Sequence, residues 1–130
     1  MEQPVSEFKS KAGFRRVLNA SSFAMQGLAT AWRSEHSFRQ EVVIVALGTI
    51  AALLLPVSGF QKLVLIGVML LVLIVELINS AIEAIVDRIS LDRHPLSKNA
   101  KDFGGAAVAL TILLAVITWA TVLYSRFMWW

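Results

Sequence analysis

The sequence contains 130 residues, enough for one small domain, and 57% of them are hydrophobic. A soluble core of this size cannot bury so much apolar surface, so the composition argues against a soluble protein and favours a membrane protein. Cysteine is absent, which excludes disulfide bonds, thiol nucleophiles and thiolate metal sites. The formal net charge is only +3, so the placement of the charges is more informative than their sum.

The N-terminal part divides into two segments. Residues 1–12 are polar and we expect them to be flexible; no short apolar segment follows their charges, so we expect no cleaved signal peptide. Residues 13–33 show a helical period, with one apolar face made of Phe14, Val17, Leu18, Met25, Leu28 and Trp32. The opposite face is made of Arg15, Arg16, Asn19, Gln26, Thr30 and Arg33. This pattern predicts an amphipathic helix at the membrane surface, the alternative being a helix packed on a soluble partner.

Three long apolar stretches follow, and each predicts a membrane helix. They cover about residues 39–57, 62–88 and 98–125, where roughly 20 residues suffice to cross the hydrocarbon core. Pro56, Ser58 and Gly59 mark the first turn, and the polar stretch Ser90–Asp102 forms the second connection. The expected fold class is an all-α membrane protein, with a surface helix and three transmembrane helices in a single membrane domain covering residues 1–130.

The orientation in the membrane follows from the basic residues. Two regions are rich in Lys and Arg: the N-terminal region (Lys9, Lys11, Arg15, Arg16, Arg33 and Arg39) and the second connection (Arg88, Arg93, Lys98 and Lys101). The first turn has only Lys62 and the C-terminus only Arg126. Because cytoplasmic segments carry the excess of positive charge, we expect a cytoplasmic N-terminus and an external C-terminus.

Polar side chains form a stripe along the second predicted span. In "VELINSAIEAIVDR" (Val75–Arg88), the residues Glu76, Asn79, Glu83 and Asp87 share one helical face, with Ser80 beside them. Ionisable residues inside a membrane are costly and usually functional, although Asn and Ser also join helices by hydrogen bonds. We therefore interpret the stripe as a site that descends from the cytoplasm into the lipid.

The depth of each carboxylate indicates its chemistry. Glu76 lies some 10 Å below the cytoplasmic boundary, where it can act as general base toward a lipid hydroxyl. The shallower Glu83 and Asp87 suit Mg²⁺, and either Glu35 or Glu41 could join Glu83 around the metal.

Basic and aromatic residues near the same depth suggest a nucleotide. Lys98 and Lys101 in the opening turns of the third span would form an anion site suited to phosphate, although Lys98 fits an ordinary cytoplasmic lysine equally well. Phe23 stands on the polar side of the surface helix, where it could stack on a base or contact a neighbouring subunit.

Three blocks resemble one family, the small integral-membrane diacylglycerol kinases of bacteria. They are "FRQE" (Phe38–Glu41), "VELINSAIEAIVDR" and "AKDFGGAAV" (Ala100–Val108). The middle block is similar to the family signature E-x-x-N-[ST]-A-[IV]-E-x-x-x-D, and the resemblance covers nearly the whole chain from about Gly13. It implies three spans, a surface helix and a homotrimer with sites shared between subunits.

The resemblance also implies a role for each site residue. It makes Glu76 the catalytic base, and Glu35 and Glu83 the ligands of Mg²⁺ and phosphate. The nucleotide and phosphate site would be shaped by Arg16, Asn19, Phe23, Lys101 and Asp102. Asn79, Ser80, Glu41 and Asp87 would shape the substrate site. Asn19, Phe23 and Met25 depart from the residues common in the family (Lys, Tyr and Trp), which affects the details of adenine binding.

The sequence therefore predicts a kinase of the bacterial inner membrane that uses MgATP to phosphorylate diacylglycerol to phosphatidic acid, with no nucleic-acid partner. A related kinase acting on undecaprenol is the nearest alternative, because the two share the signature. A small proton-coupled transporter using Glu76 would leave the lysines and the other carboxylates without a role. A non-catalytic assembly subunit would leave the polar stripe unexplained.

Overall fold

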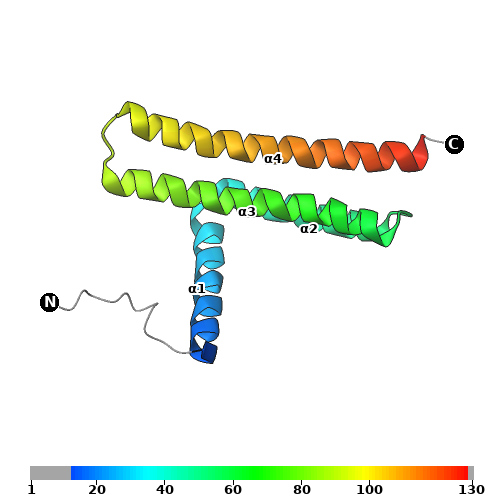
Figure 1. Cartoon of the computed structure of the whole chain (residues 1–130), viewed down its shortest axis with the longest axis horizontal. Helices are drawn as coiled ribbons and strands as arrows, with labels where there is room; N and C mark the ends of the chain where they lie inside the picture. The colour runs from blue at the N-terminus through cyan, green and yellow to red at the C-terminus, as the bar shows by residue number, and fades with distance from the viewer. Residues whose placement is uncertain (1–12, 129–130) are drawn as a thin grey trace.

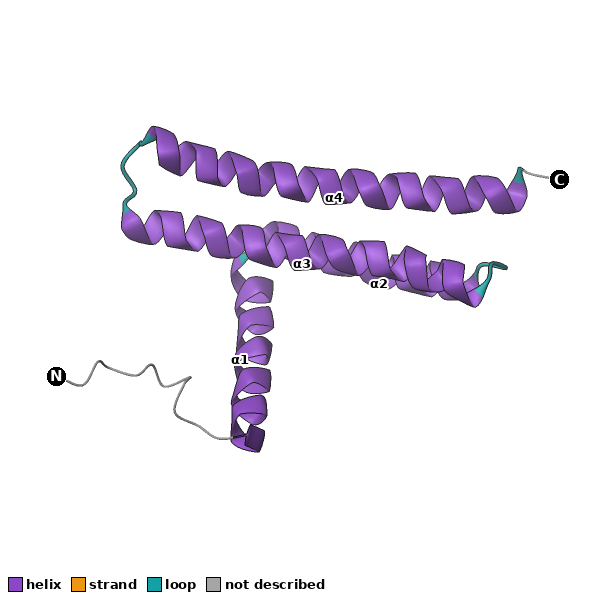
Figure 2. Cartoon of the chain, in the orientation of Figure 1, coloured by secondary structure: helices purple, strands orange, loops and turns teal. Residues whose placement is uncertain are grey.

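The computed structural model describes residues 13–128, and this part of the chain is built of α-helices joined by short connections (Figures 1 and 2). The helices are α1 (Gly13–Ser34), α2 (His36–Leu54), α3 (Gly59–Ile89) and α4 (Pro95–Phe127). Three of them, α2, α3 and α4, are long and apolar enough to cross a membrane. The prediction of three long apolar helices is thereby confirmed, and the expected flexible segment 1–12 lies outside the described residues.

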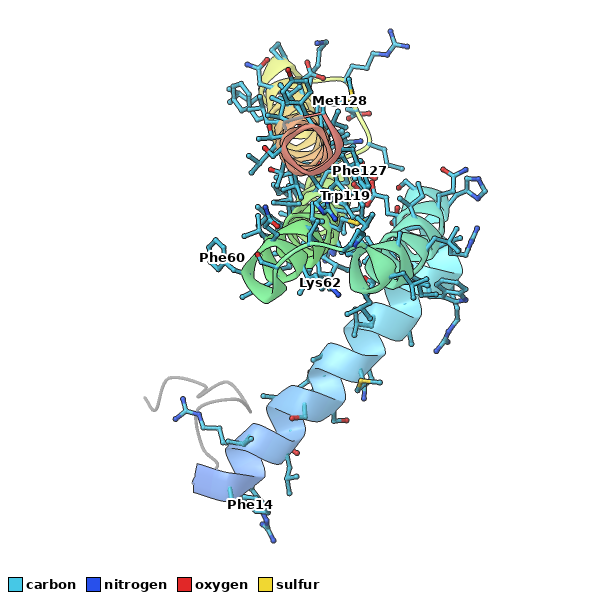
Figure 3. The ribbon with its side chains drawn as sticks, turned by 90° about the vertical axis from the view of Figure 1, so that its right-hand side faces the viewer. Phe14, Phe60, Lys62, Trp119, Phe127 and Met128 are labelled. Carbon is cyan, nitrogen blue, oxygen red and sulfur yellow. The ribbon has the colours of Figure 1, made fainter. Side chains whose placement is uncertain are left out.

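The three long helices lie side by side, with α3 between α2 and α4 (Figures 1 and 3). Helix α1 runs crosswise to them and extends away, joined to the bundle at the start of α2. In the end-on view, Phe14 marks the far end of α1, well away from α4 (Figure 3). The chain thus consists of a packed group of three helices and one projecting helix.

Local sequence explains where the long helices begin and end. Helix α2 ends at Leu54, before the expected residue 57, because Leu55 precedes Pro56 and takes an extended conformation. Helix α3 begins at Gly59, before the expected residue 62, because Ser58 and Gln61 form a capping box: Gln61 N donates to Ser58 Oγ (3.1 Å) and Ser58 N donates to Gln61 Oε1 (3.0 Å).

The start of α4 has a different cap. Helix α4 begins at Pro95, where the missing N–H of proline costs nothing, and His94 Nδ1 accepts from Leu96 N at 3.1 Å. The corner between α1 and α2 is held by Arg39, whose guanidinium donates to Trp32 O (2.8 Å) and Arg33 O (3.0 Å). These carbonyls end α1 and would otherwise need water or another donor.

A small apolar core lies toward the end of the bundle that carries the α2–α3 turn. Ala52, Leu65 and Val122 are buried there, and Trp119 packs against them while donating from Nε1 to Leu65 O at 3.3 Å (Figure 3). Most other large apolar side chains on the helices are exposed. Exposed apolar helix surface of this extent requires lipid or further protein around it.

Candidate active site

The polar stripe lies on α3 and changes from buried to exposed along the helix. Glu76 is 5% exposed, and it is the buried charged side chain among residues 13–128. Asn79, Ser80 and Glu83 are half-buried, and Asp87 is exposed. The stripe therefore runs from a buried carboxylate to the connection between α3 and α4.

The buried carboxylate is held from α2. Ser37 Oγ donates to Glu76 Oε1 at 2.6 Å, across 39 residues of sequence. Glu41, one helical turn beyond Ser37, interacts electrostatically with Glu76, and its Oε2 is buried without a hydrogen-bond partner. Two carboxyl groups from neighbouring helices thus interact in one partly buried region, and Glu41 Oε2 has no hydrogen-bond partner among the described residues.

Asn79 connects the buried part of the stripe with its outer part. Its Nδ2 donates to Glu83 Oε1 at 3.3 Å, whereas its Oδ1 is buried without a partner. The Asn79 amide lies against Gly104 of α4, where a Cβ would collide with Oδ1. The absence of a side chain at Gly104 therefore gives Asn79 its space.

Charged residues of α3 and α4 meet at the outer end. Lys101 Nζ donates to Asp87 Oδ1 at 2.7 Å, and Lys98 pairs with Asp102 one turn along the same helix. A cavity of about 650 Å³ lies under the α3–α4 connection, lined in part by these four residues. Its volume is that of a small-molecule site, about 300–1,000 Å³.

The predicted residues on α1 lie elsewhere. Arg16, Asn19 and Phe23 belong to the projecting helix, which extends away from the end of α3 that carries the stripe (Figure 1). Glu35 stands at the corner between α1 and α2 and is half-buried. One chain therefore assembles the residues of α2, α3 and α4 but does not bring those of α1 beside Glu83 and Lys101.

Known proteins of similar sequence identify the family. The family model described as prokaryotic diacylglycerol kinase matches residues 22–123. The chain belongs to the prokaryotic diacylglycerol kinase family. The predicted family is confirmed, and with it the prediction of a lipid kinase. The alternatives of a transporter and of a non-catalytic subunit lose their support.

Individual members of the prokaryotic diacylglycerol kinase family match over nearly their whole length. A diacylglycerol kinase of Pseudomonas aeruginosa is 50% identical over 118 residues, which cover 91% of this chain and 96% of the relative. One from Escherichia coli K12 is 48% identical over 115 residues, covering 88% and 94%. One from Helicobacter pylori is 34% identical over 116 residues, covering 89% and 91%.

A family of kinases implies a divalent metal, and the donor chemistry fits Mg²⁺. Within residues 13–128, no group of three or more His, Asp and Glu side chains is arranged to hold a metal ion. Mg²⁺ is usually bound by one or two carboxylates together with substrate phosphates, so such a group is not required. Glu83 and Glu35 provide hard carboxylate oxygens in half-buried positions. The donor set therefore suits a metal that arrives with the nucleotide.

Three contacts in this structure were not predicted from the sequence. They are the Ser37–Glu76 hydrogen bond, the Arg39 bonds to the end of α1, and the Asn79–Gly104 contact. Each joins different helices, and the spacing along one helix carries no signal for it. For the contact between Asn79 and Gly104, the sequence offered one signal: a small residue such as glycine permits the close approach of two helices.

Proposed function

We propose that the chain is an ATP-dependent diacylglycerol kinase that converts diacylglycerol to phosphatidic acid at the cytoplasmic face of the bacterial inner membrane. The similar proteins named diacylglycerol kinase support the lipid substrate. The observation that carries the reaction is the burial of Glu76, 5% exposed and hydrogen-bonded to Ser37, on a helix long enough to span the membrane. A carboxylate in that position is costly to bury, and ionisable residues inside a membrane are usually functional.

In this proposal Glu76 is the general base. The primary hydroxyl of diacylglycerol approaches sideways from the bilayer and gives its proton to Glu76 as its oxygen attacks the γ-phosphorus of ATP. Ser37 engages Oε1, and the second carboxylate oxygen, Oε2, accepts the proton. The bond between the γ-phosphorus and the bridging oxygen of ADP breaks, so that phosphatidic acid and ADP are formed.

The outer half of the stripe would form the part of the site that binds the phosphate groups. Glu35 and Glu83 would hold Mg²⁺, which when bound neutralises charge on the phosphate oxygens. Lys101 and Asp102, together with Arg16, Asn19 and Phe23, would bind the nucleotide. Glu41, Asn79, Ser80 and Asp87 would fix the shape of the site. The hydrogen bond from Asn79 to Glu83 and the pair of Lys101 with Asp87 support this arrangement.

We further propose a homotrimer with sites shared between subunits. The support is geometric: α1 projects away from the stripe of its own chain, so its nucleotide residues would serve a neighbouring subunit (Figure 1). The exposed apolar surface of the three long helices offers area for such packing. In the assembly, α1 would lie amphipathically in the membrane interface, with the N-terminus in the cytoplasm and the C-terminus in the periplasm.

The test is a direct assay of the products. Purified protein in mixed micelles is given MgATP with diacylglycerol or with undecaprenol, and ³¹P NMR follows the lipid phosphate. We expect phosphatidic acid, its loss when EDTA removes Mg²⁺, and no turnover by Glu76→Gln in a protein that remains folded. If undecaprenol is phosphorylated and diacylglycerol is not, undecaprenol is the substrate. Near-normal turnover by Glu76→Gln would contradict the assignment of the base.

A further inference from the structure

The first turn of α2 presents a hydroxyl group to the buried carboxylate. Ser37 is the second residue of α2, and its Oγ donates to Glu76 Oε1 at 2.6 Å in a partly buried hydrogen bond. A hydrogen bond to an ionised carboxylate is shorter and stronger than one between neutral groups. The 2.6 Å separation lies in the range expected for such a bond, about 2.5–2.7 Å.

The backbone that carries Ser37 is fixed on both sides. Before it, the carbonyl groups that end α1 accept hydrogen bonds from Arg39. After it, Phe38 is 4% exposed and anchors the first turn of α2 in the bundle. Ser37 therefore holds Glu76 from a rigid corner rather than from a mobile loop, as is required of a group that orients a reacting side chain.

The other neighbour of Glu76 on α2 has the opposite effect. Glu41 is a carboxyl group whose interaction with Glu76 is repulsive, and its buried Oε2 donates nothing to Glu76. Without the hydroxyl of Ser37, the carboxylate of Glu76 would face this repulsion with one fewer donor. Its side chain could then turn away from Glu41 and lose its position.

We propose that Ser37 is a positioning residue, which fixes one carboxylate oxygen of Glu76 so that the other faces the hydroxyl group of the lipid. Ser37 does not touch the substrate in this account and acts only through Glu76. The inference rests on the proposed role of Glu76 as base. It assigns to the α1–α2 corner a part in the chemical step itself, separate from the binding of the metal and the nucleotide.

The test compares Ser37→Ala with Ser37→Thr in the full chain in mixed micelles. We expect Ser37→Ala to lower kcat about tenfold, a change of about 1.4 kcal/mol in the barrier. KM for MgATP should stay within about twofold, because a group that acts only on the base changes the transition state and not nucleotide binding. Threonine keeps the hydroxyl, so Ser37→Thr should restore most of kcat. Ser34→Ala is the matched control, because the Ser34 hydroxyl bonds only within its own turn, to Thr30 O at 2.7 Å.

Comparison of two single variants separates this inference from the proposed function. If Glu76→Gln is inactive and Ser37→Ala retains full kcat, Ser37 has no positioning role and the base assignment stands. If Glu76→Gln is active, the base assignment fails first. A Ser37→Thr variant as slow as Ser37→Ala at an unchanged thermal midpoint would also overturn the proposal.

Discussion

Asn79 of α3 lies directly against Gly104 of α4, which contributes no side chain at this point. A Cβ on Gly104 would collide with the Asn79 side-chain oxygen, and Asn79 Cα is only 3.8 Å from the Cβ position. The same amide donates through Nδ2 to Glu83. The absence of a side chain at Gly104 thus leaves room for the Asn79 amide that donates to Glu83.

Substitution of this glycine should damage the site more than the fold. We expect Gly104→Ala to push the Asn79 amide away from Glu83 and to lower kcat for lipid phosphorylation about tenfold. Overpacking costs about 1–3 kcal/mol and is partly offset by the better helix propensity of alanine, about 1 kcal/mol. Gly105→Ala is the matched control, since a Cβ there meets nothing within 4 Å. Equal activity of the two variants would show that the contact has no functional weight.

The ion pair between Lys101 and Asp87 should matter for the nucleotide and little for stability. Both side chains are about half exposed, at 43% and 49%, and ion pairs between exposed side chains contribute little to stability. We expect Lys101→Met to raise KM for MgATP about tenfold, because a cation that binds phosphate is lost. Steady-state kinetics at varied MgATP measure this. A similar rise for Lys98→Met would mean that general positive charge, and not Lys101, is responsible.

At the far end of the bundle, Arg126 should affect stability alone. Its Nε donates to Pro56 O at 2.7 Å and ties the end of α4 to the α2–α3 turn. We expect Arg126→Gln to lower the free energy of unfolding in detergent by about 1 kcal/mol. Arg126→Lys keeps the charge and lacks Nε. If it lowers the free energy of unfolding as much as Arg126→Gln does, the effect comes from the hydrogen bond and not from the charge. kcat should be unchanged in both, since this end of the bundle is distant from the stripe (Figure 1).

The interfacial position of α1 can be measured because the sequence contains no cysteine. A nitroxide label placed by Met25→Cys, on the apolar face, should be relaxed by oxygen dissolved in the lipid. A label at Gln26→Cys, on the polar face, should be relaxed by a water-soluble nickel chelate. Electron paramagnetic resonance in vesicles distinguishes the two. Equal access of the chelate to both labels would place α1 in water or on a soluble partner.

The sequence was informative wherever a single helix carries the signal. The period of α3 places Glu76, Asn79, Glu83 and Asp87 on one stripe, and hydropathy identified the three long helices. Boundaries shifted by a few residues where a cap or proline acted, as at Ser58 and Pro95. These features depend on neighbours in the chain, which is why they could be deduced.

Contacts between helices depend on rotation and register, which one sequence does not encode in a readable pattern. Glu41 was one of two residues that could join Glu83 around the metal, and in the structure it interacts electrostatically with Glu76. Lys101 was read as a phosphate ligand, and here it engages Asp87. Arg16 and Phe23 belong to the projecting helix α1 and not to the stripe of their own chain, so the roles assigned to them stay predictions.

Helix α3 contains 31 residues, so it is about 46 Å long, against a hydrocarbon core of about 30 Å. Aligned with the membrane normal, the same unbroken helix extends about three turns beyond the lipid tails. Glu76 and Glu83 are seven residues apart, which sets a rise of about 10 Å between them. The continuous helix thus keeps Glu76, proposed to meet the lipid, and Glu83, proposed to bind the metal of the nucleotide, at a constant separation. No hinge between these two groups has to close before they can act together.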